Sequence, residues 1–142
     1  ERRAVQKRYT ALLEGDVAAD HGLIDLPLRP DIDNRPVQIV DFVHGRPAQT
    51  RYRVLAREVD RTRIAFEPIT GRSHQLRVHA AAPRLLTRPD GVPVPGGLAA
   101  PIQGDVLYAG APQGSRLMLH ADRLEFVTPD GHALDIESPA PF

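Results

Sequence analysis

Two arginines and two histidines lie within the twelve residues Pro68–His79, which read PITGRSHQLRVH. Ser73 is a residue type that caps helix N-termini, so we expect a short helix to begin there. At helical spacing His74 and Arg77 share one face of that helix. Arg72 lies just before it, where free backbone N–H groups and the helix dipole favour an anion. The run therefore predicts a site for a phosphate or a carboxylate.

A second group of arginines lies upstream of this run. Of the 18 basic residues 17 are arginine, and 18 acidic residues bring the net charge to zero. Arginine suits bidentate phosphate contacts and stacking on bases better than lysine does. Alternation along an extended segment places Arg51, Arg53 and Arg57 on one face. This row would either follow a phosphate backbone or form an ordinary solvent-exposed face, and both interpretations stay open.

Other chemistries have less support in the sequence. There is no cysteine, which excludes disulfides and thiolate metal sites. His74 and His79 are five residues apart and would lie roughly 140° apart around a helix, which does not favour metal ligation. Ser73 and His74 are neighbours and point in different directions, so they do not form a nucleophilic pair. We expect no metal site.

The composition is that of a soluble domain. With 142 residues and 42% hydrophobic content, the chain is long enough to bury a modest core. No apolar run approaches the ~20 residues that a membrane span needs. We therefore expect a cytoplasmic protein without membrane attachment.

A hairpin is the clearest element that could position these side chains. Thr50–Val59 and Thr62–Pro68 are strand-like runs joined by a short connection. We expect Tyr52, Val54 and Ala56 to share the face on which the second strand places its own apolar residues.

Further strands are predicted on both sides of this hairpin. The helix should end at Pro83 after about ten residues, and residues 83–101, which are rich in proline and glycine, should form a loop without regular structure. Antiparallel strands with one or two short helices predict an α+β fold, a mainly antiparallel mixed sheet. The other expected strands are residues 5–13, 37–42, 116–120, 124–128 and 133–137, with a loop at 23–28.

The run TGRSHQLRVH resembles the arginine-containing motif of the RluA-type pseudouridine synthases, which isomerise uridine in large-subunit ribosomal RNA and transfer RNA. Other segments match in the family's order, so the resemblance covers nearly the whole chain, and it favours the branch that acts on both kinds of RNA. These segments are KRYTALLEG (7–15), GRPAQTRYRVL (45–55), PIQGDVLYAG (101–110), RLMLHADRLEF (116–126) and SPAPF (138–142).

The resemblance implies roles for individual residues. In that family a uridine is flipped out of the RNA, an aspartate attacks, the N-glycosidic bond breaks, and a carbon–carbon bond forms after the uracil turns, without a cofactor. Tyr9 would stack on the flipped base and help remove the C5 proton, and Arg77 would pair with the aspartate. Arg72 and His74 would hold backbone phosphate or brace the loop. Leu119 would support the base from below.

One feature of the family is missing from this sequence. The catalytic aspartate lies in an H-R-L-D type motif upstream of the tyrosine, and the 142 residues contain no such motif. We therefore expect residues 1–142 to be the C-terminal part of a catalytic domain, inactive by itself, with RNA as its partner. The alternative is a noncatalytic RNA-binding module with the same fold. We also expect an exposed sheet edge across which copies could associate.

Overall fold

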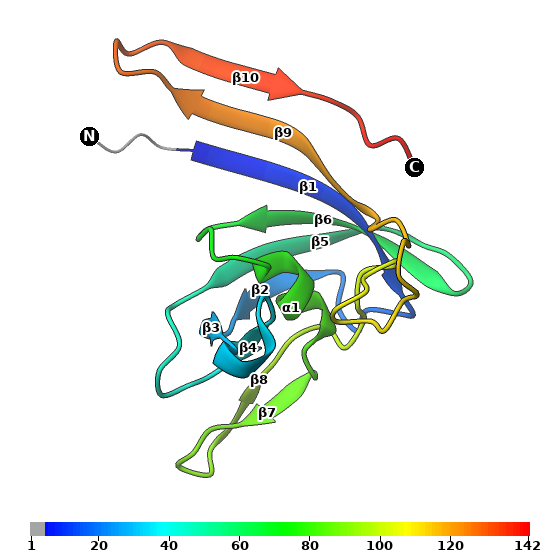
Figure 1. Ribbon diagram of the computed structural model, residues 1–142. Coiled ribbons are helices and arrows are strands. Elements are labelled where there is room, and N and C mark those ends of the chain that lie inside the picture. The colour runs from blue at the N-terminus through cyan, green and yellow to red at the C-terminus, as the bar shows by residue number, and fades with distance from the viewer. Residues whose placement is uncertain (1–4) are drawn as a thin grey trace.

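The computed structural model describes residues 5–142, which form a six-stranded sheet in the order β10-β9-β1-β6-β5-β2 (Figure 1). All neighbouring strands in this sheet pair in antiparallel orientation. The predicted α+β fold with a mainly antiparallel sheet is confirmed. The strands are β1 (Val5–Glu14), β2 (His21–Asp25), β5 (Gln49–Arg57), β6 (Arg61–Pro68), β9 (Leu119–Val127) and β10 (Ala133–Glu137).

Smaller elements lie around the helix. The single α-helix of the described residues, α1 (Gln75–Ala81), follows β6 directly. Two short hairpins and a 3-10 turn complete the domain: β3 (Leu28–Pro30) with β4 (Gln38–Val40), η1 (Ile32–Asn34) between them, and β7 (Leu85–Thr87) with β8 (Pro93–Pro95). Within residues 5–142, none of the helical segments has the length and apolar character of a membrane span.

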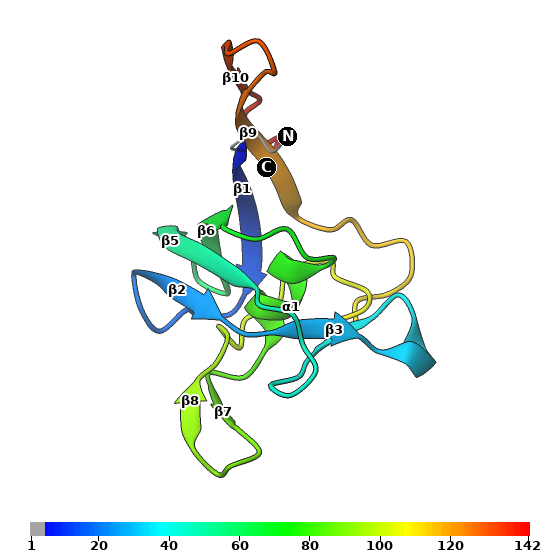
Figure 2. The ribbon, with the colours of Figure 1, turned by 90° about the vertical axis from the view of Figure 1, so that its left-hand side faces the viewer.

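The core lies between one face of the sheet and α1. Register places Tyr9 opposite Phe66 and Ala11 opposite Ile64, so these side chains share that face. Figure 2 shows α1 against it, with the chain that follows the helix returning beneath the sheet. The buried apolar residues of this core are Ala11, Leu13, Val17, Ile24, Leu26, Ile64, Phe66, Leu76, Ala80, Ala82, Leu98, Ala100 and Ile102.

The far end of the sheet has no such cover. Figure 1 shows β9, β10 and the first half of β1 extending beyond the part that carries α1. All five residues of β10 are exposed, and β10 and β2 are the two edge strands. The sheet therefore has a packed half and an exposed arm.

The central hairpin forms as the sequence predicts, with one difference in its register. Tyr52 pairs with Phe66 and Val54 with Ile64, but a bulge follows, so Ala56 lies opposite Arg63. An extra residue in one strand moves every later side chain to the other face. Arg57 consequently leaves the row of Arg51 and Arg53 and donates hydrogen bonds to Asp16 and Asp20.

Three other predictions are wrong. Residues 83–101 contain the β7–β8 hairpin, whose two strands pair locally despite their prolines. Residues 23–28 contain most of β2 and the start of β3, because pairing with β5 and β4 further along the chain stabilises them. Two runs predicted as separate strands join in one continuous β9, which pairs with β1 through a bulge. The final hairpin of β9 with β10 is confirmed.

Candidate active site

A cavity of about 570 Å³ opens between the sheet and the N-terminal end of α1. Five of the residues predicted as functional from the sequence line it: Tyr9, Arg72, His74, Arg77 and Leu119. They come from β1, the loop after β6, α1 and the start of β9. The fold thus gathers side chains from positions 9 to 119 around one space.

The loop before α1 is fixed by the side chain of Gln75, which is only 3% exposed. Its Oε1 accepts hydrogen bonds from Thr70 Oγ1 at 2.7 Å and from the Arg72 backbone N–H at 3.0 Å. Its Nε2 donates to Gln49 O and to Thr50 Oγ1. A buried amide with all these partners holds loop and strand together, so the wall of the cavity is preformed.

His74, and not Ser73, stands at the N-cap of α1. It has a left-handed backbone, with φ of 55°, and no side chain caps the helix, so the prediction of Ser73 as N-cap is wrong. The helix is also shorter than predicted, at seven residues, although it ends before Pro83 as expected. The left-handed turn brings the His74 ring to Tyr108: His74 Nδ1 lies 2.7 Å from Tyr108 Oη.

Arg77 forms a two-point ion pair with Asp105. Arg77 Nε donates to Oδ2 at 3.0 Å and Nη2 donates to Oδ1 at 2.7 Å. The backbone N–H groups of Leu107 and Tyr108 donate to the same Oδ1, each at 3.0 Å. The Asp105 side chain is fully buried, whereas 18% of the Arg77 side chain is exposed. Arg77 Nη1 has no hydrogen-bond partner within residues 5–142, which leaves it as the donor that Arg77 offers to the cavity.

The ion pair fixes both charges. Burial disfavours the charged form of Asp105, but hydrogen bonds from Arg77 and from backbone N–H groups outweigh it, so the pKa of Asp105 lies below its ordinary value. The hydrogen bond to Asp105 raises the pKa of Arg77. Arg77 Cζ also lies 5.2 Å from the centroid of the Tyr108 ring, a cation–π contact. Because Asp105 offsets its charge, Arg77 acts in the cavity mainly as an oriented hydrogen-bond donor.

Gly104 makes this arrangement sterically allowed. Its φ is 82°, and a Cβ at this position would collide with the carbonyl oxygen of Arg116. Glycine alone accommodates both the left-handed backbone and the close approach. The chain can therefore turn so that the next residue, Asp105, reaches Arg77.

Arg51 and Arg53 lie elsewhere. Arg53 is opposite Ala65, which is opposite Thr10, so these arginines occupy the sheet face that points away from Tyr9 and Arg77. There they line a separate cavity of about 540 Å³. The structure therefore brings together five of the seven predicted residues and separates the other two from them.

Three residues at this site were not predicted from the sequence. Asp105 and Tyr108 lie in the run PIQGDVLYAG, which carried the resemblance but no assigned role. They are 28 and 34 positions from their partners Arg77 and His74, too far for a local pattern to indicate the pairing. Lys7, the only lysine of the sequence, also lines the cavity. Lys7 could have been predicted to lie beside Tyr9, because residues two apart on a strand share a face.

Comparisons with known proteins agree with this geometry. A family model described as RNA pseudouridylate synthase matches residues 1–82. The dual-specificity RNA pseudouridine synthase RluA of Yersinia pestis is 44% identical over 136 residues, covering 89% of this chain and 59% of that protein. The protein of the same name from Escherichia coli K12 is 40% identical over 145 residues, covering 99% of this chain and 59% of that protein. The chain thus belongs to the RluA-type family of RNA pseudouridine synthases, as the sequence predicts.

Solved structures support the same conclusion. Human RNA pseudouridylate synthase domain containing 1 superimposes with a TM-score of 0.75 at 27% identity, over 97% of this chain and 56% of that one. Human RNA pseudouridylate synthase domain containing 4 shares the fold, with a TM-score of 0.66 at 23% identity, over 96% of this chain and 58% of that one. The chain spans somewhat more than half the length of each of these relatives.

The arrangement can bind an anion and a flat ring side by side. Arg72 and Arg77 supply donors, and Tyr9 and Leu119 supply an aromatic and an apolar surface. Within residues 5–142, no group of three or more histidine, aspartate or glutamate side chains is placed to hold a metal ion.

Proposed function

We propose that this chain forms the uridine-binding part of an RNA pseudouridine synthase that acts on ribosomal and transfer RNA. The observation that carries the proposal is the meeting of Tyr9, Arg77 and Leu119, with Arg72 and His74, around one cavity. Its volume of about 570 Å³ is in the range of small-molecule sites and admits a flipped nucleotide. The bacterial relatives are named dual-specificity RNA pseudouridine synthases, which supports an RNA substrate.

Each residue has a role in this proposal. Tyr9 stacks on the flipped uracil and assists removal of the C5 proton, and Leu119 contacts the base from the other side. Arg77 donates through Nη1 to the nucleophilic carboxylate and orients it, while Asp105 holds the guanidinium in place. Arg72, whose Nε donates to Pro47 O at 2.9 Å, directs its remaining donors to a backbone phosphate. The isomerisation exchanges one glycosidic bond for another, so it needs no oxidant or reductant.

The reaction also needs a nucleophilic aspartate. Among the described residues no aspartate lines the cavity, and Asp105 is buried with both oxygens engaged. A carboxylate so held is not free to attack a sugar. We infer that the 142 residues bind RNA but do not isomerise uridine by themselves.

Tritium release tests this inference. The 142-residue chain is incubated with RNA whose uridines carry tritium at C5, and release of label to water is measured. We expect no release above an RNA-only control, together with a complex in an electrophoretic assay. Robust release would contradict the missing-nucleophile argument, and failure to bind structured RNA even at low salt would contradict the RNA-binding function.

Substitution of Tyr9 tests whether the cavity binds the uridine. Tyr9→Ala should weaken binding of a uridine-containing stem–loop by about tenfold or more, because stacking contributes roughly 1–3 kcal/mol per base. Tyr9→Phe keeps the ring and is the matched control, expected to bind like the unmodified chain. Fluorescence anisotropy measures all three. Equal affinities would mean that Tyr9 is only a packing residue.

A noncatalytic RNA-binding module is the second candidate function. The observation in its favour is the same absence of an aspartate from the described lining of the cavity. The protein made from the complete reading frame distinguishes the two functions. Tritium release by that protein supports the synthase, and RNA binding without release supports the module.

Self-association and a cytoplasmic location complete the proposal. The exposed edge of β10 offers unpaired backbone groups to a second copy. Sedimentation velocity at two protein concentrations tests for a dimer. A sedimentation coefficient that corresponds to a monomer at both concentrations would contradict this association.

A further inference from the structure

A second groove, of about 440 Å³, adjoins the uridine cavity and has no role in the function proposed above. His74 lines both spaces, so they are neighbours. The groove runs between α1 and the turn that follows η1. Its lining consists of Pro30, Arg35, Pro36, Gln38, Ser73 and His74.

Tyr108 determines which nitrogen of His74 carries the proton. The backbone N–H of Gln38 donates to Tyr108 Oη at 2.9 Å, so the tyrosine accepts this bond and its own proton needs an acceptor. His74 Nδ1, at 2.7 Å, is the partner of that hydroxyl. The hydroxyl therefore donates to Nδ1, and in the neutral ring the proton is on Nε2. Nε2 has no hydrogen-bond partner within residues 5–142, which leaves a fixed N–H donor beside both spaces.

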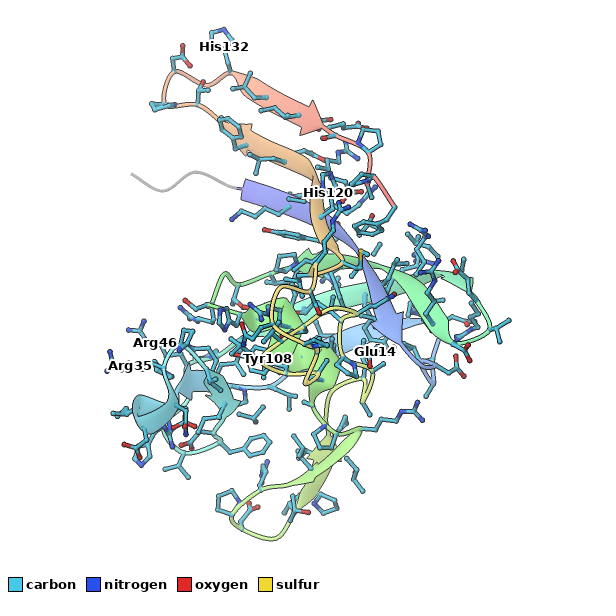
Figure 3. The ribbon with its side chains drawn as sticks, turned by 45° about the vertical axis from the view of Figure 1, so that its right-hand side comes forward. Glu14, Arg35, Arg46, Tyr108, His120 and His132 are labelled. Carbon is cyan, nitrogen blue, oxygen red and sulfur yellow. The ribbon has the colours of Figure 1, made fainter. Side chains whose placement is uncertain are left out.

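Charge on the other side of the groove comes from arginine. Arg35 is exposed, and no carboxylate of the described residues pairs with it; the same holds for Arg46. Figure 3 shows the side chains of Arg35 and Arg46 projecting from the same side of the molecule, with Tyr108 nearer the centre. Two unpaired guanidinium groups on one side attract a polyanion.

Nearby carboxylates are mostly engaged. Asp41 pairs with Arg29 and accepts hydrogen bonds from the backbone of Val43 and His44. Asp31 accepts a hydrogen bond from Asn34. Asp33, which is exposed on η1, has no such partner among the described residues, and its negative charge would repel a phosphate in the groove.

We propose that this groove binds a phosphodiester of the RNA strand next to the flipped uridine, through the Nε2–H group of His74 and the guanidinium of Arg35. The proposal rests on the uridine-binding function and adds the path that the strand takes. The RNA leaves the cavity over His74 and continues between η1 and α1 toward Arg35 and Arg46. Tyr108 is a positioning residue for this contact, because it orients the imidazole without touching the RNA.

Binding of a structured RNA with one target uridine, measured by anisotropy at two salt concentrations, tests this path. Arg35→Ala should weaken binding by about fivefold and lower the slope of log K against log salt by about 0.7–1, as loss of one phosphate contact does. His74→Ala should weaken binding to a similar extent, and Asp33→Asn should strengthen it. Arg88→Ala is the matched control: it removes the same charge from the β7–β8 hairpin and should leave the slope unchanged.

A second experiment with modified RNA locates the contacted phosphate. A neutral methylphosphonate is placed singly at each linkage flanking the uridine. At one linkage the methylphosphonate should weaken RNA binding by the unmodified chain. In the Arg35→Ala variant the same substitution should cause no further loss of affinity. An unchanged slope in Arg35→Ala, or additive losses at every linkage, overturns this subsite while the uridine-binding function stands. No binding by the unmodified chain overturns the function itself.

Discussion

The two faces of the sheet carry cavities of similar size, about 570 and 540 Å³, and both are lined by basic residues. On the face that carries α1, the arginines are fixed: Arg77 by Asp105, and Arg72 by Pro47 O. On the opposite face, the side chains of Arg51 and Arg53 are exposed and make no hydrogen bond among the described residues, although their backbones pair within the sheet. The number of arginines is therefore similar on the two faces, and what distinguishes the cavity beside α1 is that the fold already holds its arginine side chains in position.

Removing Arg77 should have the largest effect on stability, because it leaves the buried carboxylate of Asp105 without its partner. In Arg77→Ala the buried Asp105 loses its partner, and we expect the free energy of unfolding to fall by about 3 kcal/mol. The double change Arg77→Ala with Asp105→Asn removes the stranded charge and keeps an acceptor for two backbone N–H groups, so it should recover much of the loss. Urea unfolding followed by circular dichroism measures both variants.

Arg123→Ala is the matched control for that experiment. Arg123 pairs with Asp135 and Glu125 on the exposed arm, where ion pairs contribute little. Its loss should change the free energy of unfolding by less than about 1 kcal/mol. Equal effects of the two arginines would mean that the pair of Arg77 with Asp105 is no more important for stability than a surface pair.

The next effect is a dependence of stability on pH, which originates beneath α1. His79 is fully buried; its Nε2 donates to Leu26 O at 3.0 Å and its Nδ1 lies 2.9 Å from Thr50 Oγ1. Burial lowers the pKa of His79 below the ordinary 6.5. The unfolded chain therefore binds a proton that the folded chain does not, and stability falls as the pH drops below about 6.5.

Unfolding in urea at about pH 7 and about pH 5 measures this effect. We expect the free energy of unfolding to be lower at about pH 5 than at about pH 7, because the unfolded chain takes up a proton on His79 that the folded chain excludes. His79→Gln, compared with the unmodified chain at each pH, should show a smaller difference; burial also lowers the pKa of His74, which accounts for part of what remains. An unchanged pH dependence in the variant would assign the titration to other groups.

The smallest effect is expected on the opposite face. Arg53→Ala should change the free energy of unfolding by less than about 0.5 kcal/mol, because the side chain is exposed. It should also change RNA affinity by less than about twofold if the RNA stays on the face that carries Tyr9. A lower salt slope in this variant would instead support the prediction that Arg51 and Arg53 contact phosphate, and would extend the RNA around the sheet edge.

Much of the fold could be predicted from local patterns. Alternation predicts β1 and the β5–β6 hairpin, and the apolar faces of these strands follow from their period of two. The bulge after Val54 could not be predicted this way, because register depends on the partner strand. The β7–β8 hairpin was not predicted for a different reason: the proline content of its Pro93–Pro95 strand is typical of a loop.

The family could be identified from the amino-acid sequence, through an unbroken run of ten residues from Thr70 to His79, and with it the importance of Tyr9 and Arg77. The group that holds Arg77 depends on how the chain folds, and could not be read from the local sequence. Its partner Asp105 is 28 positions away and meets it because Gly104 turns the chain against Arg116. The fold also places Arg51 and Arg53 on the sheet face opposite Tyr9. The local sequence shows which side-chain types are present and how they are spaced. Contacts between charged groups from distant segments depend instead on how those segments pack.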